Sequence, residues 1–90
     1  MVSALDYRKD GYMRIMADTG LKQIRQELGI SQEGVARRTR SVSTGTVKNA
    51  ESGKRVTFDT ATQILQAVNS LLAEAGRESI TLDDLGLTLY

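Results

Sequence analysis

Apolar residues recur at helical spacing from residue 19 onward, and polar residues fill the positions between them. The first apolar face is formed, at steps of three and four, by Leu21, Ile24 and Leu28. Asp18 or Thr19 can cap the N-terminus of this helix, and Gly29 suits the left-handed position at which helices often end. The pattern therefore predicts a first helix with one buried face that ends at Gly29.

Two short helices are predicted next, and each follows a serine. Ser31 precedes residues 32–38 and Ser43 precedes residues 44–51. A serine at such a boundary accepts a hydrogen bond from the free N–H groups of the first helical turn. The apolar stripe of each segment is narrow and made of small residues: Val35 and Ala36, then Val47 and Ala50. Two such helices can cross closely while their outer faces stay polar, which is the outline of a helix-turn-helix.

The longest apolar stripe follows Thr57, which can cap a fourth helix with Asp59 in its first turn. The stripe runs up to Gly76 and consists of Phe58, Ala61, Ile64, Leu65, Val68, Leu71, Leu72 and Ala75. It is wider than three short helices need for their own burial. Part of this face is therefore expected to contact another surface.

Residues 77–90 carry a second concentration of apolar side chains. Thr81 can cap one helical turn through Leu85, and Gly86 can close it. Either these residues fold back on the fourth helix as ordinary core, or they form a contact between subunits that removes an apolar surface from water. We favour the subunit contact, made by Leu71, Leu72, Ile80, Leu82, Leu85, Leu87, Leu89 and Tyr90.

The segments SQEGVA and VSTGTVKNAESGK resemble the Cro/repressor-type helix-turn-helix family, the lambda-repressor-like domains of phage and bacterial regulators. The resemblance covers residues 19–75 and rests on Ser31-Gln32, Ala36, Val42-Ser43 and Glu51-Ser52-Gly53-Lys54. Two features depart from the family pattern. Arg40 and Ser41 stand where a turn glycine is usual, with one extra residue, and Val56 and Thr57 stand where a proline is usual.

This resemblance implies an all-α fold, a lambda-repressor-like helix-turn-helix bundle of four to five short helices. Residues 19–76 would form the DNA-binding domain, and residues 77–90 an apolar tail for dimerisation. Residues 1–18 lack a sustained periodicity and are expected to form an N-terminal arm or an extra element. The resemblance also gives Glu51 a structural role, holding the helix-turn-helix together.

Positive charge is concentrated on the helix-turn-helix and the loop after it. Residues 37–55 hold six basic residues and one acidic residue, a net charge of +5, whereas the rest of the chain carries −4. Such a cluster can be ordinary solvated surface, or arginines pairing with a helix C-terminus, but its position favours a phosphate-binding face. We expect contacts to the DNA backbone from Gln32, Arg37, Arg38, Arg40, Ser43, Thr46, Lys54 and Arg55.

The apolar residues of helix 44–51 must face inward, so its outer side carries Thr44, Gly45, Lys48 and Asn49. Asn49 can pair with adenine N6 and N7, Lys48 can reach guanine O6 and N7 or a phosphate, and the Thr44 methyl suits a thymine methyl. Gly45 costs about 1 kcal/mol of helix propensity relative to alanine, and its bare backbone would let DNA approach closely. We expect this helix to enter the major groove and these four residues to contact bases.

Several function classes lack their usual residues. The chain contains no cysteine and no histidine, which removes thiolate metal ligands and the commonest general base. No phosphate-cradling glycine loop is present, so we expect no enzymatic activity, no metal and no cofactor. The chain has no N-terminal apolar segment and no run long enough to span a membrane. We expect a cytoplasmic, nucleoid-associated protein of bacterial or phage type.

These expectations lead to a sequence-specific transcriptional regulator, a repressor that acts as a homodimer on a pseudo-palindromic operator. An alternative is the antitoxin of a toxin–antitoxin pair, which binds a partner protein as well as its own promoter. The irregular segment 1–18 is the feature that favours this alternative.

Overall fold

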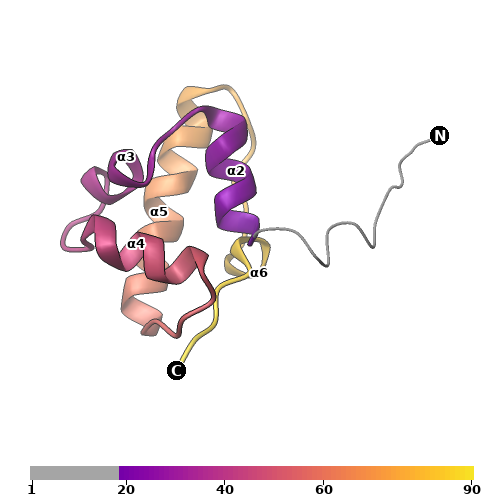
Figure 1. Cartoon of the computed structure of the whole chain (residues 1–90). Helices are drawn as coiled ribbons and strands as arrows, with labels where there is room; N and C mark the ends of the chain where they lie inside the picture. The colour runs from indigo at the N-terminus through magenta and orange to yellow at the C-terminus, as the bar shows by residue number, and fades with distance from the viewer. Residues whose placement is uncertain (1–18) are drawn as a thin grey trace.

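The computed structural model describes residues 19–90 and shows an all-α bundle over this range (Figure 1). The long helix α5 runs through the middle, with α2 on one side and α3 and α4 on the other. The helices are α2 (Gly20–Leu28), α3 (Gln32–Arg37), α4 (Thr44–Glu51), α5 (Phe58–Glu74) and α6 (Leu82–Leu85). The predicted all-α helix-turn-helix bundle is confirmed. The arm or extra element expected in residues 1–18 lies outside the described residues.

Helices α2 to α5 each begin after a threonine or serine whose hydroxyl accepts a backbone N–H three residues later. The nitrogen-to-oxygen distances are 3.2 Å at Thr19, 3.0 Å at Ser31, 3.1 Å at Ser43 and 3.1 Å at Thr57. Each cap satisfies one N-terminal donor that a helix leaves free, typically a gain of about 1 kcal/mol. Gly29 ends α2 with a φ of 70°, as its sequence position predicts.

The core is built from small and medium apolar side chains around α5. Val47 and Ala50 are fully buried, so the predicted inward face of α4 is confirmed. Each of the five described helices contributes to the same cluster, which consists of Leu21, Val35, Ala36, Val42, Val47, Ala50, Val56, Ala61, Ile64, Ala67, Val68, Leu71, Leu72 and Leu85. The valines and alanines of α3 and α4 let these two helices approach each other closely.

A buried ion pair joins the first helix to the end of the helix-turn-helix. The Arg25 guanidinium donates from Nε to Glu51 Oε2 at 2.6 Å and from Nη2 to Glu51 Oε1 at 3.0 Å. Gln32 Nε2 donates to the same carboxylate at 3.0 Å, and the Glu51 side chain is only 4% exposed. Because side chains of α2 and α3 both bind this carboxylate of α4, Glu51 joins the three helices, which is the structural role that the resemblance implied.

The turn between α3 and α4 forms without the glycine that is usual there. No residue other than glycine has a positive φ between residues 19 and 90. The backbone N–H groups of Arg40 and Ser41 both donate to Gln63 Oε1, at 3.1 and 3.0 Å. Val42 N donates to Thr39 Oγ1 at 3.0 Å. Gln63 is buried on α5. A glutamine from a distant helix therefore satisfies the turn, and the extra residue is accommodated in ordinary backbone conformations.

The C-terminal tail folds back on its own chain. Leu85 is fully buried, and Leu71 and Leu72 of α5 are 8% and 1% exposed. The partly buried side chains of Ile80, Leu82 and Leu87 pack against the same core. For Leu71, Leu72 and Leu85, the expected subunit contact is wrong, because these side chains are already enclosed within one chain. Leu89 and Tyr90 differ, since they are 36% and 83% exposed.

Two ends of the predicted α5 stripe also differ from expectation. Phe58, the first residue of α5, is 67% exposed, and Ala75 is exposed just after the last. Both positions lie at the ends of α5, where the side chains stay in contact with solvent. The buried stripe is therefore shorter than the sequence pattern.

The short helix α6 lies directly against the start of α2. A Cβ atom on Gly20 would stand 1.9 Å from the Asp84 backbone oxygen, so only glycine allows this approach. On the other side, Asn69 of α5 holds the segment before α6: Ile80 N donates to Asn69 Oδ1 at 2.8 Å, and Asn69 Nδ2 donates to Ile80 O at 3.1 Å. Residues 80–86 are thus part of the folded domain.

Candidate nucleic-acid interface

The outer face of α4 is exposed along its whole length. Thr44, Gly45, Lys48 and Asn49 are all exposed, opposite the buried Val47 and Ala50. The cap that orients this helix uses two hydroxyls: Ser43 Oγ accepts from Thr46 N, and it lies 3.0 Å from Thr46 Oγ1. The residues expected to contact bases therefore form one continuous surface on a helix that its neighbours hold in place.

Gly45 has no packing role within the chain. A Cβ atom at this position would meet nothing closer than Ser43 Oγ, at 3.8 Å, which is an ordinary contact. Glycine within a helix costs up to about 1 kcal/mol relative to alanine. The fold therefore gives no reason for glycine here, in contrast to Gly20.

On one side of α4 lies a hollow of about 380 Å³, which we call the loop hollow. It is lined by Thr46, Asn49, Lys54, Arg55, Val56, Thr57, Thr60 and Tyr90. Lys54 and Arg55 are exposed in the loop after α4, so the hollow combines two cations with several hydroxyls. None of the described residues that line it is an aspartate or a glutamate, so its side chains are suited to an anion.

On the other side of α4 lies a smaller hollow of about 210 Å³, the α2 hollow. Its lining residues are Lys22, Gln32, Lys48, Glu51 and Ser52. Gln32 was expected to contact DNA, and its amide nitrogen donates to Glu51. Two lysines thus stand at a site where the buried Glu51 carboxylate is already bound by Arg25 and Gln32.

The arginines at the end of α3 and in the turn each pair with an acid. Arg37 bonds to Glu33 at 2.6 Å, Arg38 bonds to Glu74 at 2.7 and 2.9 Å, and Arg40 lies 3.7 Å from Asp59. The hydrogen bonds from Arg38 lower the pKa of the Glu74 carboxyl. Exposed pairs of this kind contribute little to stability and can be exchanged.

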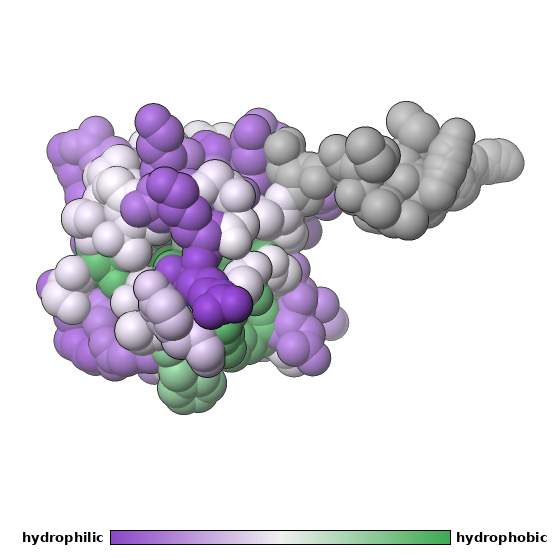
Figure 2. Space-filling model, turned by 60° about the horizontal axis from the view of Figure 1, so that its bottom comes forward, coloured by the Kyte–Doolittle hydropathy of each residue, from purple (hydrophilic) through white to green (hydrophobic). Residues whose placement is uncertain are grey.

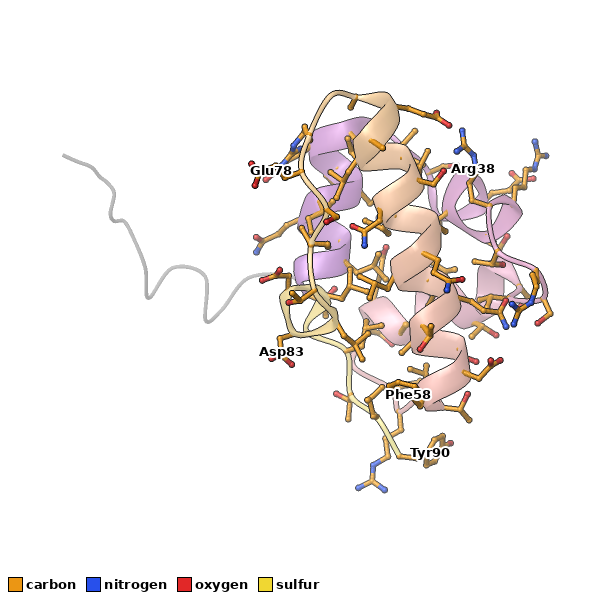
Figure 3. All side chains as sticks on the ribbon, turned by 180° about the vertical axis from the view of Figure 1, so that it is seen from behind. Arg38, Phe58, Glu78, Asp83 and Tyr90 are labelled. Carbon is orange, nitrogen blue, oxygen red and sulfur yellow. The ribbon has the colours of Figure 1, made fainter. Side chains whose placement is uncertain are left out.

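Arg38 differs from the other two arginines in its position. Besides the pair with Glu74, its Nη1 donates to Ser70 Oγ at 3.2 Å, so that α5 holds the guanidinium. Figure 3 shows Arg38 toward one end of α5 and Phe58 and Tyr90 at the other. Arg38 is one of the residues expected to contact the DNA backbone, but it lies far from the loop hollow.

Seen from the end that carries the C-terminus, the molecule is mostly hydrophilic (Figure 2). Purple and pale side chains cover most of this view, and green hydrophobic surface appears mainly in the lower centre, where one green group protrudes at the lower edge. Phe58, Leu89 and Tyr90 are the large hydrophobic side chains exposed in residues 19–90. This end of the molecule thus offers polar donors with a few apolar side chains among them.

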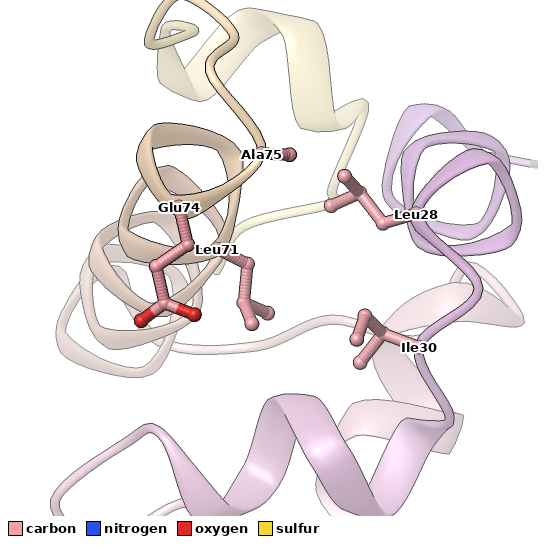
Figure 4. Close-up of a pocket in the computed structure, with 5 residues that line it drawn as sticks. All are labelled: Leu28, Ile30, Leu71, Glu74 and Ala75. Atoms are coloured by element: carbon pink, nitrogen blue, oxygen red, sulfur yellow. The ribbon is translucent and has the colours of Figure 1, made fainter.

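A third hollow, of about 200 Å³, has a different character. Leu28, Ile30, Leu71 and Ala75 line it, with Glu74 at its edge (Figure 4). The Glu74 carboxylate is bound by Arg38. This lining offers apolar contact rather than donors for an anion, and it lies outside the surface formed by α4 and its flanking hollows.

Three residues of this surface and its support were not predicted in these roles from the sequence. Lys22 joins the α2 hollow from the polar face of α2, and Gln63 supports the turn from the interior of α5. Tyr90 reaches the loop hollow from the far end of the sequence. Each role depends on the packing of segments distant in sequence. A buried glutamine within the apolar stripe of α5 was the one available hint.

Within residues 19–90 there is no group of three or more side chains of the kinds that hold a metal ion. In the same range, no helix is both long enough and apolar enough to cross a membrane. The segment that favoured a toxin partner, residues 1–18, lies outside the described residues.

Comparison with known proteins places this geometry in a family. A family model described as helix-turn-helix matches residues 21–74, which is more than half of the chain and spans α2 to α5. No curated protein and no solved structure matches the chain. The matched residues include the capped helices, the turn and the exposed face of α4. The chain belongs to the helix-turn-helix family of DNA-binding regulators, of the Cro/repressor type that its sequence resembles.

Proposed function

We propose that this protein is a sequence-specific transcriptional repressor that inserts α4 into the major groove of double-stranded DNA. The observation that carries the proposal is the exposed face of Thr44, Gly45, Lys48 and Asn49, flanked on both sides by hollows that contain lysine. A major groove is about 12 Å wide and admits one helix, with a phosphate backbone on either side. The proposal assigns one of those two backbones to each hollow.

The four exposed residues supply groups that distinguish bases. The Asn49 amide suits adenine N6 and N7, and the Lys48 ammonium suits guanine O6 and N7. The Thr44 methyl group suits the methyl of thymine. Gly45 lets the α4 backbone approach the groove, because no side chain stands between it and the DNA.

The backbone contacts are proposed on both sides of the groove. Lys54 and Arg55 bind phosphates at the loop hollow, with Thr46 and Ser43 beside the N-terminus of α4. Gln32 and Lys22 meet the other strand at the α2 hollow. Arg37 and Arg40 join this surface by exchanging their exposed acidic partners for phosphate, at little net loss. Arg38 is left out, since α5 holds it away from the loop hollow.

The working form is proposed to be a two-fold dimer on a pseudo-palindrome. One short helix contacts only a few base pairs, which gives little specificity over a genome. Two copies about 34–36 Å apart would contact two half-sites on one side of the duplex. Since Leu85 is buried in its own chain and Ile80, Leu82 and Leu87 pack against the same core, the contact between copies falls to exposed apolar residues. Phe58 and Leu89 are such residues: Phe58 lies at the end that carries Tyr90 (Figure 3), and Leu89 pairs with Val56, which lines the loop hollow.

Selection of duplexes from a random pool with the full chain tests this function. The expected product is an inverted repeat with half-sites about 10 base pairs apart, centre to centre. Placed across a promoter, such a site would let the bound protein block transcription in a purified system. A pool that gains no motif after repeated rounds would contradict sequence-specific binding.

A further inference from the structure

Residues Thr88–Tyr90 lie against the loop that follows α4. Val56 N donates to Thr88 O at 2.9 Å, and Tyr90 N donates to Val56 O at 3.1 Å. These bonds flank the isolated parallel bridge between Val56 and Leu89. The end of the tail is therefore paired with the backbone of the segment that directly follows Lys54 and Arg55.

The Tyr90 side chain is held at the DNA-facing surface without being buried. It is 83% exposed, yet it lines the loop hollow together with Asn49, Lys54 and Arg55. Burial of the ring therefore does not explain its position, which the paired backbone sets. A tyrosine placed in this way presents a phenolic donor beside two cations.

One threonine hydroxyl of the same hollow keeps a proton that no other residue of the pair accepts. Thr57 Oγ1 accepts from Thr60 N and donates its own proton to Thr60 Oγ1, both at 3.1 Å. The Thr60 hydroxyl thus acts as acceptor in this pair and keeps a proton for a further bond. Neutral side-chain donors and two cations, with no aspartate or glutamate among the described lining residues, form a set that can bind a phosphate group.

We propose that the C-terminal tail is part of the DNA-contacting surface. Tyr90 donates its phenolic hydroxyl to a backbone phosphate bound at the loop hollow, and the pairing of residues 88–90 with Val56 holds the Lys54–Arg55 loop in place. This inference rests on the proposed DNA-binding function and adds a contact from outside residues 21–74, the part that the family model matches. It replaces, for Tyr90, the subunit contact expected from the sequence.

Tyr90→Phe tests the contact, because it removes one hydroxyl from an exposed side chain and leaves the ring. The probe is a duplex of mixed sequence and about one helical turn, which has room for one domain and makes the result independent of dimer formation. We expect affinity to fall about fivefold, as for the loss of one hydrogen bond. The factor should be the same at every salt concentration, because the phenol is uncharged and releases no counterion.

Ser79→Ala is the matched control, since it also removes one hydroxyl from an exposed residue of the tail and does not line the hollow. Its affinity for the short duplex should equal that of the parent. Equal affinity of Tyr90→Phe and the parent would overturn the inference while leaving the proposed function intact. A Tyr90→Ala protein that binds the short duplex normally but loses its dimer mass would also overturn it, and would assign Tyr90 to a second copy. If the parent bound no duplex at all, the proposed function itself would fail.

Discussion

Gly45 and Gly20 are both helical glycines, yet the structure gives them opposite reasons to be glycine. At Gly20 an added Cβ would overlap the Asp84 carbonyl, whereas at Gly45 it would meet only Ser43 Oγ at an ordinary distance. The chain itself therefore requires the first glycine and only tolerates the second. Our proposal assigns the second one to the surface that α4 presents to DNA.

Gly45→Ala should separate stability from binding. We expect the free energy of unfolding to rise by up to about 1 kcal/mol, because alanine is the better helix former and its methyl group finds space. Affinity for the operator should fall, since the methyl group stands between α4 and the groove. Urea denaturation and fluorescence anisotropy measure the two quantities. A variant that is more stable and binds equally well would remove Gly45 from the interface.

Lys54 and Arg55 should contribute to binding through charge. Changing either to alanine is expected to weaken binding to all sequences and to lower the slope of log affinity against log salt by about 1, because one released counterion is lost. Arg38→Ala is the control, since its guanidinium is held on α5 by Glu74 and Ser70. Identical slopes for Lys54→Ala, Arg55→Ala and the parent would show that the loop does not touch DNA.

The role of a residue could be predicted from the sequence where the residues that surround it in the structure are also its neighbours along the chain. Val47 and Ala50 were predicted to face inward from the helical period alone, and both are fully buried. Arg38 was grouped with the other basic residues by charge, because nothing near it in sequence indicates that Glu74 and Ser70 lie beside it. Tyr90 could not be placed at the loop hollow for the same reason.

At the scale of elements, α6 and the start of α2 form one unit. Gly20→Ala should lower the free energy of unfolding by about 1–3 kcal/mol, because the methyl group would push α6 away from α2. Urea denaturation gives the value, and Gly45→Ala is the matched control with the opposite sign. Unchanged stability in Gly20→Ala would mean that α6 moves aside freely and is not an integral part of the domain.

Helix starts were predictable because capping is a contact between near neighbours. Thr19, Ser31, Ser43 and Thr57 each receive the bond that their positions suggest. The fate of the tail was not predictable in this way. An apolar segment that folds back and one that dimerises have the same sequence pattern, and only the packing of Leu85 against the core decides between them.

At the scale of the whole molecule, the proposed dimer should depend on the exposed end that bears Phe58. Light scattering of the full chain on its selected operator is expected to give two copies per duplex. Phe58→Ser should reduce this to one copy at the same protein concentration, because it removes exposed apolar area from the contact. Glu78→Ser, at the opposite end of the molecule in Figure 3, serves as control. Two copies bound with unchanged affinity in Phe58→Ser would move the contact elsewhere.

The arrangement of the domain depends on local signals in the helix-turn-helix and on contacts between segments that are distant in sequence. The helix-turn-helix was predictable because its small apolar residues, caps and closing glycine are all local signals. The support around it was not, since Gln63, Asn69 and Arg25 act across the interior on segments far away in sequence. The hollows on either side of α4 arise only when these segments are packed together.

The central claim, that the outer face of α4 contacts bases, is tested most directly by repeating the duplex selection with Asn49→Ala. Asn49 is exposed and outside the core, so the variant should fold like the parent. We expect it to lose about 1–3 kcal/mol on the operator and to relax the preferred base at one position in each half-site. Its affinity for DNA of mixed sequence should stay unchanged. The same motif, recovered with the same strength at every position, would contradict base contact by α4.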